Sequence, residues 1–415
     1  MKKTYSRKEF LRNTLIASAT PMLASPAFAA HGRRRPSGLP DKYENLIDLH
    51  GQFDAPVIID SITLLRVENK FFIRVRSTDG AEGIVIDNGR LSHLYPIMKE
   101  KVIPFFIGKD ARDMETLVDE VYAYESNYKL AGMAFWNCVA QVEMGVLDML
   151  GKVAGKSVGA ILGKVRRRRI PVYISSLTRE TTPEQEVEWL AQRLQETGAQ
   201  AVKLKIGGRM SKNADAFPGR TDNLIPLARK SFGDDVAIYV DSNGSYDAPK
   251  AIEVGRLLEA HGIGFYEEPC PFEDHEATRQ VAEALAVPIA GGEQDSNLSM
   301  FEWMIKNNAF QLVQPDLYYN GGFIRCLRVA KMAAAVGINV TPHSPKADAQ
   351  SVCMLHFASV IANSGPHQEF YGHPMKHESW YAPHFDVTEG HIIVPDGYGL
   401  GITYDADFIA KAKLV

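Results

Sequence analysis

The sequence predicts an α/β protein whose main part is a modified (β/α)7β barrel of the TIM type, preceded by a smaller α+β domain. Short apolar runs typical of buried parallel strands recur, and each ends in charged or polar residues: QAVKLKIG, DVAIYVDSN, GIGFYEEP, VPIAGGE, FQLVQPD and GINVTPHS. The charged residues that end the later runs follow one another at nearly equal intervals, as expected for repeated strand-plus-helix units. Such units close into a parallel barrel, whose carboxyl-terminal rim carries the chemistry.

Residues 1 to 30 are predicted to be an export signal. Basic residues, among them Lys2 and Arg12, precede a mildly apolar run that ends in the small-x-small pattern Ala27-Phe28-Ala29. The stretch SRKEFLR resembles a twin-arginine signal, except that Lys8 stands where the second arginine should be, so the ordinary secretory route stays open. We therefore expect a periplasmic or otherwise exported protein.

The rest of the chain divides into four predicted segments. Residues 31 to 54, rich in Arg, Pro and Gly, are typical of a flexible lead-in. Residues 55 to 165 predict three antiparallel strands, VIIDSITLLRV, KFFIRVRS and GAEGIVIDN, followed by helices. Residues 166 to 385 predict the barrel, and residues 386 to 415 include a predicted strand pair within FDVTEGHIIVPDGYGLG.

The helices between the barrel strands carry start and stop signals. Between residues 182 and 197, Thr182 and Gln185 predict a capping box around Pro183, and Gly198 predicts the end of the helix. The apolar stripe of this helix is formed by Val187, Leu190, Ala191 and Leu194.

Three carboxylates at successive strand ends, Asp241, Glu267 and Glu293, predict a metal site. They would repel one another unless a cation lay between them, and ligation by oxygen alone suits a hard ion such as Mg²⁺. Alternatively, each of these acids could be a helix N-cap or a solvated loop residue. Their regular spacing favours the metal site.

Acid/base candidates lie on both sides of these acids in the sequence. Lys203 and Lys205 are two residues apart in a strand, so their ammonium groups share one face, where neighbouring cations can turn a lysine into a base. Asp316 and His343 end the next two strands, and a carboxylate beside an imidazole fixes its tautomer and supports its protonated form. A structural histidine is the alternative for His343.

As a set, these motifs resemble the enolase superfamily, and within it the mandelate racemase subgroup. The resemblance covers nearly the whole chain after residue 55, and it includes KLK, the Asp of VDSN, the first Glu of EEP, the Glu of GGE, the Asp–His pair and Glu369 in HQEFYG. It implies that residues 55 to 165 form a capping domain over the barrel mouth, to which the C-terminal segment returns. It also implies Mg²⁺, an ene-diolate intermediate and a Lys or His base. We expect a homo-oligomer.

Further candidates follow from single positions and loops. Asn243 of VDSN is a candidate for substrate binding, and Glu369 is a candidate catalytic residue. The polar segment GGRMSKNADAFPGRTDN is long for a loop after a barrel strand, so Arg209 or Arg220 could contact a polyol or a distal carboxylate. The run from Arg166 to Arg169 is better explained as a linker than as an anion site. The histidines near the eighth strand, His367, His373, His377 and His384, lack ligand spacing.

Composition limits the partners. The 415 residues are 45% hydrophobic with a formal net charge of −4, which favours a large core and argues against nucleic acid or an acidic membrane surface as partner. No stretch after the signal is apolar enough to span a bilayer. The four cysteines have no metal-ligand spacing, although a disulfide is possible in an oxidising compartment.

The expected activity is removal of the proton α to a carboxylate, with Lys205 or His343 as the base. Dehydration of a sugar acid to a 2-keto-3-deoxy acid is favoured, because the polar loop after Lys205 suits a polyhydroxylated ligand. A racemase or epimerase of a 2-hydroxy acid and a cycloisomerase of an anhydro sugar acid are alternatives. A non-catalytic exported solute-binding protein would not need the two lysines, the histidine and the three metal ligands.

Overall fold

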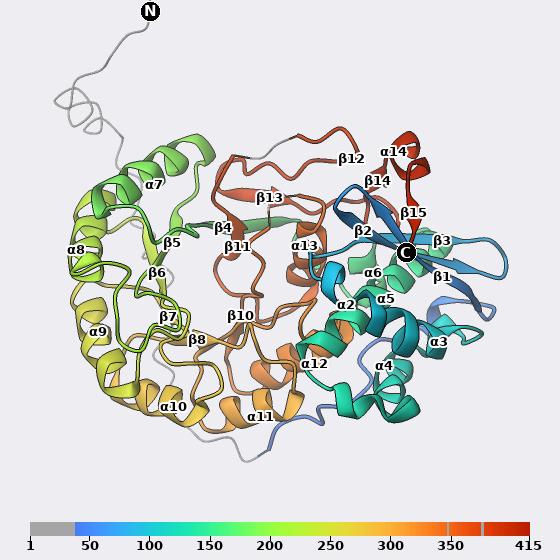
Figure 1. The fold of residues 1–415 in the computed structure, drawn as a ribbon, viewed down its shortest axis with the longest axis horizontal. Helices are drawn as coiled ribbons and strands as arrows, with labels where there is room; N and C mark the ends of the chain where they lie inside the picture. Colours follow the sequence, from blue (N-terminus) through green and yellow to red (C-terminus); the bar gives the residue numbers. More distant parts are fainter. Residues whose placement is uncertain (1–37, 347, 375–376) are drawn as a thin grey trace, which may run out of the picture. The chain divides into compact units, whose positions relative to one another are not determined.

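The computed structural model describes residues 38 to 346, 348 to 374 and 377 to 415 (Figure 1). The predicted export signal and the first part of the predicted lead-in lie outside these residues. The described residues belong to one compact unit, so the two predicted domains are described together. Within the described part of the chain, no helix is long and apolar enough to cross a membrane.

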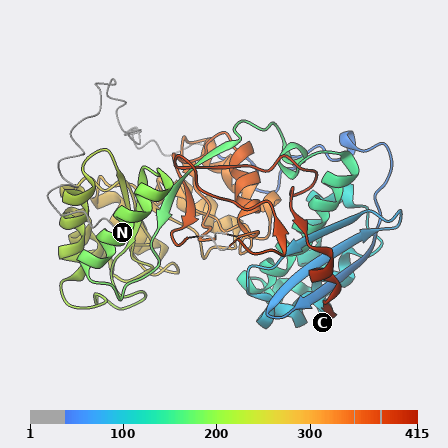
Figure 2. The ribbon, with the colours of Figure 1, turned by 90° about the horizontal axis from the view of Figure 1, so that it is seen from above.

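The antiparallel sheet joins the two ends of the described chain. Its strand order is β15-β1-β2-β3, with β1 Ile59–Val67, β2 Lys70–Ser77, β3 Glu82–Ile86 and β15 Lys413–Leu414. Leu414 pairs with Leu65, so the C-terminal residues add an edge strand to the predicted meander, as the dark red segment beside the blue strands in Figure 2 shows. The sequence pattern could not predict so short a strand, because its partner lies at the other end of the chain.

Helix α5, Met133–Ala154, covers this sheet and is buried along most of its length. Gly83 of β3 permits the close approach, because a Cβ atom added there would lie 2.1 Å from the carbonyl oxygen of Gly145. The other helices of this region are short: η1 His50–Gln52, α2 Leu91–Ile97, η2 Met98–Val102, α3 Ile103–Phe106, η3 Ala111–Asp113, α4 Met114–Ala123, η4 Tyr124–Leu130 and α6 Val158–Leu162.

The parallel sheet confirms the predicted barrel class. Its strands run in the order β10-β9-β8-β7-β6-β5-β4-β11, and a bridge from Val340 to Ser364 brings the segment before β11 against β10. The strands are β4 Arg169–Ser175, β5 Ala201–Lys205, β6 Ala237–Asp241, β7 Tyr266–Glu267, β8 Ile289–Gly291, β9 Leu312–Val313, β10 Asn339–Val340 and β11 Gln368–Tyr371.

One helix follows each strand from β4 to β10, and Figure 1 shows α7 to α11 in succession around the outside of the strands. They are α7 Pro183–Thr197, α8 Arg220–Phe232, α9 Ala248–Ala260, α10 His275–Ala284, α11 Leu298–Lys306, α12 Phe323–Ala334 and α13 Ser351–Val360. The predicted capping box of α7 is present, and Gly198 ends the helix in the left-handed conformation.

The C-terminal segment differs from the predicted strand pair. It forms one strand within that stretch, β13 His391–Ile393, which pairs with β4 of the barrel. Nearby, β12 Tyr381–Ala382 pairs with β14 Thr403–Tyr404, and α14 Ala406–Ala410 leads to β15. The segment therefore contacts both sheets, while the predicted domain boundaries remain predictions.

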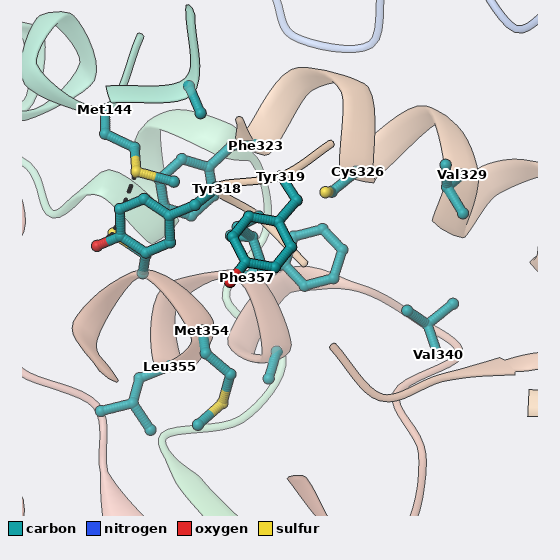
Figure 3. Packing of buried hydrophobic residues seen from close by; sticks show 14 of the residues in the cluster. Met144, Tyr318, Tyr319, Phe323, Cys326, Val329, Val340, Met354, Leu355 and Phe357 are labelled. Atoms are coloured by element: carbon teal, nitrogen blue, oxygen red, sulfur yellow. Dashed lines mark hydrogen bonds between the residues drawn. The ribbon is translucent and has the colours of Figure 1, made fainter. Parts of the chain in front are cut away.

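The interior contains one continuous hydrophobic cluster that includes both sheets. Figure 3 shows Met144 of α5 beside Tyr318, with Phe323 of α12 and Phe357 of α13 close by. The Cys353 sulfur lies 3.7 Å from the Met144 sulfur, and all four cysteines are free and buried. The arginine run also serves packing, because Arg167 donates to the carbonyl oxygens of Ala358 at 2.6 Å and Ile361 at 2.8 Å, at the end of α13.

Candidate active site

The three predicted metal ligands meet at the carboxyl ends of β6, β7 and β8. Asp241 and Glu267 are paired in register at the ends of β6 and β7, and Glu293 follows β8 by two residues. One carboxylate oxygen from each lies within 4.8 Å of the others, and all three side chains are buried. Parallel strands place their carboxyl ends at one edge, which is why residues distant in sequence converge here.

The chemistry of this trio fits Mg²⁺. Among the described residues, Oε1 of Glu267 and Oε2 of Glu293 are buried and accept no hydrogen bond. Burial raises the pKa of Glu267. The charge of Lys203 opposes this shift, and the charges of Asp241, Glu369 and Glu293 add to it. A hard divalent cation coordinated by these oxygens would satisfy them and offset the repulsion.

Lys203 is a buried cation that contacts two carboxylates at this centre. Its Nζ lies 2.7 Å from Oε2 of Glu267 and 2.8 Å from Oε1 of Glu369, and its side chain is fully buried. Burial lowers the pKa of Lys203, but these two carboxylates outweigh burial and raise it well above its usual value. Lys203 therefore stays protonated and holds the two acids in place.

Glu369 has the same bracing role from β11. Ser175 donates its hydroxyl to Oε1 at 2.9 Å, and the backbone N–H of Ser344 donates to Oε2 at 2.9 Å. Burial raises the pKa of Glu369, but the positive charges of Lys203, His343 and Lys205 outweigh burial and lower it. An ionised Glu369 links the first strand, the last strand and the loop after His343.

Lys205 lies on the same face of β5 as Lys203 but closer to the mouth. Its ammonium contacts the Asp241 carboxylate and lies 3.4 Å from Oδ1 of Asn243. The side chain is 6% exposed, whereas that of Lys203 is fully buried. Of the two predicted lysines, Lys205 is the one that keeps some exposure.

His343 is held on the opposite flank. Its Nδ1 lies 2.7 Å from Oδ2 of Asp316, and Oδ1 of Asp316 accepts backbone N–H groups from Tyr318 at 2.8 Å and Tyr319 at 3.0 Å. Nε2 therefore faces Glu293, at 3.4 Å from its Oε2. Burial lowers the pKa of His343, but Glu293 and Asp316 outweigh burial and raise it to about 9.

The strand order puts these two groups on either side of the trio. Lys205 ends β5, next to β6, and His343 follows β10, beyond β8 and β9. A carbon atom of a ligand held at the trio would thus have a lysine on one side and an imidazole on the other.

The predicted substrate-binding residues separate into different environments. Arg209 is exposed in the loop after β5. Arg220 is fully buried and donates to the carbonyl oxygens of Lys205 at 2.7 Å and Thr181 at 2.9 Å, so it supports the end of β5. The prediction that Arg220 contacts substrate does not fit this arrangement, because backbone oxygens already occupy its guanidinium.

Asn243 lies at the mouth within a polar chain that the sequence reasoning missed. Its Oδ1 accepts from Nη2 of Arg179 at 2.8 Å, and its Nδ2 donates to Oε2 of Glu268 at 3.2 Å. Both Asn243 and Glu268 adopt positive φ, at 42° each. Arg179 follows the first barrel strand by a few residues, a rim position that could have identified it.

Comparison with known proteins agrees with this geometry. Residues 186–408 match the enolase C-terminal domain-like family. The arabinonate dehydratase of Saccharolobus solfataricus is 27% identical over 311 residues, covering 73% of this chain and 79% of that protein. A solved protein from Roseobacter denitrificans, proposed to be a racemase, has a TM-score of 0.80 and 32% identity, covering 86% of this chain and 99% of its own.

Another solved protein, a mandelate racemase/muconate lactonizing protein from Paracoccus denitrificans in complex with magnesium, has a TM-score of 0.78 and 25% identity, covering 86% of this chain and 99% of its own. The barrel and its acid/base groups, together with these relatives, define an enzyme of the lyase or racemase type. The family match spans more than half of the chain and includes every predicted site residue from Lys203 to Glu369. The chain therefore belongs to the enolase C-terminal domain-like family, which confirms the resemblance to the enolase superfamily.

Proposed function

We propose that this protein dehydrates a sugar acid to a 2-keto-3-deoxy acid. The observation that carries the proposal is the placement of Lys205 and of the His343–Asp316 pair on the two flanks of the carboxylate trio. Removing a proton α to a carboxylate and a hydroxyl from the β-carbon requires one base and one acid near the same two carbons. This site has a candidate for each.

Asp241, Glu267 and Glu293 would hold Mg²⁺. When bound, the ion would offset the negative charge that develops on the substrate carboxylate. Lys203 and Glu369 keep the trio in place, and Asp316 keeps Nε2 of His343 turned toward the site.

Dehydration needs one group that accepts a proton and one that donates a proton, and this site has a candidate for each. Lys205 takes the α-proton, and the protonated His343 donates a proton to the β-hydroxyl, which leaves as water. The resulting enol loses its hydroxyl proton and gains a proton at the β-carbon, which gives the 2-keto-3-deoxy acid. The contact of His343 Nδ1 with the Asp316 carboxylate at 2.7 Å supports the role of acid, because a carboxylate beside an imidazole stabilises its protonated form. The relative from Saccharolobus solfataricus, a dehydratase, supports the same reaction class.

A racemase or epimerase is the second candidate, and the same flanking pair favours it. In that reaction one group removes the α-proton and the other returns a proton to the opposite face. The similarity to a solved protein proposed to be a racemase supports this candidate. A cycloisomerase would use the same α-proton transfer on an anhydro sugar acid, and a solute-binding protein would catalyse none of these reactions.

The deciding experiment follows the α-proton. The protein is incubated with Mg²⁺ in D₂O with aldonic acids, aldaric acids and simple 2-hydroxy acids, and the products are read by NMR. A dehydratase yields a 2-keto-3-deoxy acid, whereas a racemase returns labelled acid of both configurations. Absence of both deuterium and product with every acid would contradict the proposed function.

Lys205→Ala and His343→Asn identify the acting groups. We expect each variant to lose turnover by about 100-fold or more, because general acid or base catalysis contributes on that order. If both variants exchange the α-proton like the parent, the residues are wrongly assigned.

We further propose that the protein is exported to the periplasm and assembles as a homo-oligomer. The signal-like segment before Ala30 supports export. Mass spectrometry of periplasmic protein should find an amino terminus near Ala30, and an intact terminus on cytosolic protein would contradict export. Light scattering of purified protein measures the oligomeric state.

A further inference from the structure

Arg90 presents an unpaired cation near the barrel mouth. It follows β3 in the predicted capping domain, and the residue is exposed. Its Nη2 and Nε donate to the hydroxyl oxygen of Tyr319 at 3.1 Å and 3.3 Å. Within the described ranges, no carboxylate forms an ion pair with Arg90. A guanidinium fixed by a neutral phenol keeps its charge available for a ligand.

Tyr319 places this cation beside the acid/base pair. Its ring centroid lies 6.1 Å from that of His343, and its backbone N–H donates to Asp316. Arg90 is close enough for the charge of Asp316 to act on it. The guanidinium therefore lies on the His343 flank of the site, whereas the trio would receive the first carboxylate of a substrate.

Tyr319 and Arg90 each have a hydrogen-bond donor without a partner among the residues that the structure describes. The hydroxyl of Tyr319 accepts from Arg90, but its own hydrogen has no acceptor among the residues that the structure describes. Nη1 of Arg90 likewise has no hydrogen-bond partner there. A phenol O–H and a guanidinium edge together match the two oxygens of a carboxylate.

Building on the proposed function, we propose that Arg90 and Tyr319 bind a second carboxylate at the distal end of the substrate. The preferred substrates are then aldaric acids, which carry a carboxylate at each end, over aldonic acids, which end in an alcohol. Asp316 and Glu293 make this flank acidic, so a distal carboxylate needs a local cation to bind. Arg209 is a weaker candidate, because no side-chain hydrogen bond fixes it within the described residues.

Binding calorimetry in Mg²⁺ tests this subsite independently of turnover. Aldaric and aldonic acids of matched carbon configuration are compared in pairs. We expect the parent to bind the diacid of at least one pair about 10-fold to 100-fold more tightly, as for a charge-assisted hydrogen bond. Arg90→Gln and Tyr319→Phe should each reduce this preference, and Arg90→Lys should restore part of what Arg90→Gln loses.

Arg76→Gln is the matched control, since Arg76 lies in β2 of the same predicted domain and pairs with Glu82 at 2.8 Å. It should retain the full preference. Equal affinity of the parent for both acids of every pair would overturn the subsite, even if the enzyme dehydrates them. A preference that survives in both Arg90→Gln and Tyr319→Phe would also overturn it. Absence of both deuterium incorporation and 2-keto-3-deoxy product in D₂O would instead reject the proposed function, and calorimetry would still test the subsite.

Discussion

At the scale of single residues, burial decides which charged groups act and which hold the site together. Lys203 and Lys205 are equivalent by sequence spacing, yet Lys203 is fully buried between two carboxylates, whereas the Lys205 side chain is 6% exposed. Strand alternation predicts a shared face but not depth along the barrel axis. The division of roles between the two lysines therefore needed the packed structure.

Lys203→Met tests the bracing role. Removing the ammonium leaves Glu267 and Glu369 buried without their cation, so we expect a loss of about 3 to 5 kcal/mol in the free energy of unfolding. Urea unfolding with Mg²⁺ present measures the loss. Exposed Lys99→Met is the control and should change little. Unchanged stability in Lys203→Met would show that the two acids do not depend on this lysine.

The burial of His356 predicts that the folded protein loses stability in acid. It is fully buried, its Nδ1 accepts from the N–H of Gly159 at 3.3 Å, and its Nε2–H donates to the carbonyl of Leu400 at 3.1 Å. Burial lowers the pKa of His356 to about 4, below the unfolded value of 6.5. As the pH falls, the unfolded chain therefore binds a proton at this histidine before the folded chain does. The contribution of neutral His356 to the free energy of unfolding is thus present above pH 6.5 and is lost as pH falls toward 4.

The expected loss across this window is about 3 kcal/mol. Urea unfolding between pH 7 and 4 should show a smaller slope with pH in His356→Asn than in the parent. His93→Asn, at an exposed position, should keep the parent slope. An identical slope in His356→Asn would mean that this histidine does not control acid stability.

At the scale of elements, the start of α12 connects the two predicted domains. Glu143 of α5 accepts the backbone N–H groups of Phe323 at 2.6 Å and Ile324 at 2.8 Å. Gly322 makes room for it, because an added Cβ would lie 1.9 Å from Oε2 of Glu143. The loop that carries Asp316 leads directly into this helix, so the cap helps to position the acid/base pair.

Glu143→Ala should leave two buried N–H groups without an acceptor and reduce the free energy of unfolding by about 2 to 5 kcal/mol. Glu143→Gln keeps one acceptor oxygen and should lose less. Chemical denaturation at pH 7 compares the three proteins. If alanine is tolerated as well as glutamine, Glu143 does not secure α12.

At the scale of the whole molecule, the metal centre ties several strands together. Asp241, Glu267 and Glu293 come from three consecutive strands, and the acids repel one another without a cation. An ion that binds the folded chain but not the unfolded chain stabilises the folded state by mass action.

Mg²⁺ added to chelated protein should therefore raise the melting temperature, with about 2.7 kcal/mol gained when the free ion reaches 100 times its Kd. Differential scanning calorimetry measures the shift. Glu293→Gln should show a smaller shift, since one anionic ligand is missing. A melting temperature independent of Mg²⁺ would contradict the metal site.

The sequence by itself determined the barrel class, the strand ends and the residue types at the rim. Local apolar periodicity encodes short buried strands, and capping residues mark where helices begin and end. The capping box of α7 is such a case. Only the tertiary structure decided the edge strand β15, the pairing of β13 with β4, the burial of Arg220 and the approach of Arg90 to Tyr319. These contacts join segments far apart in the chain, and their free energy comes from burial and polar pairing that no local pattern records.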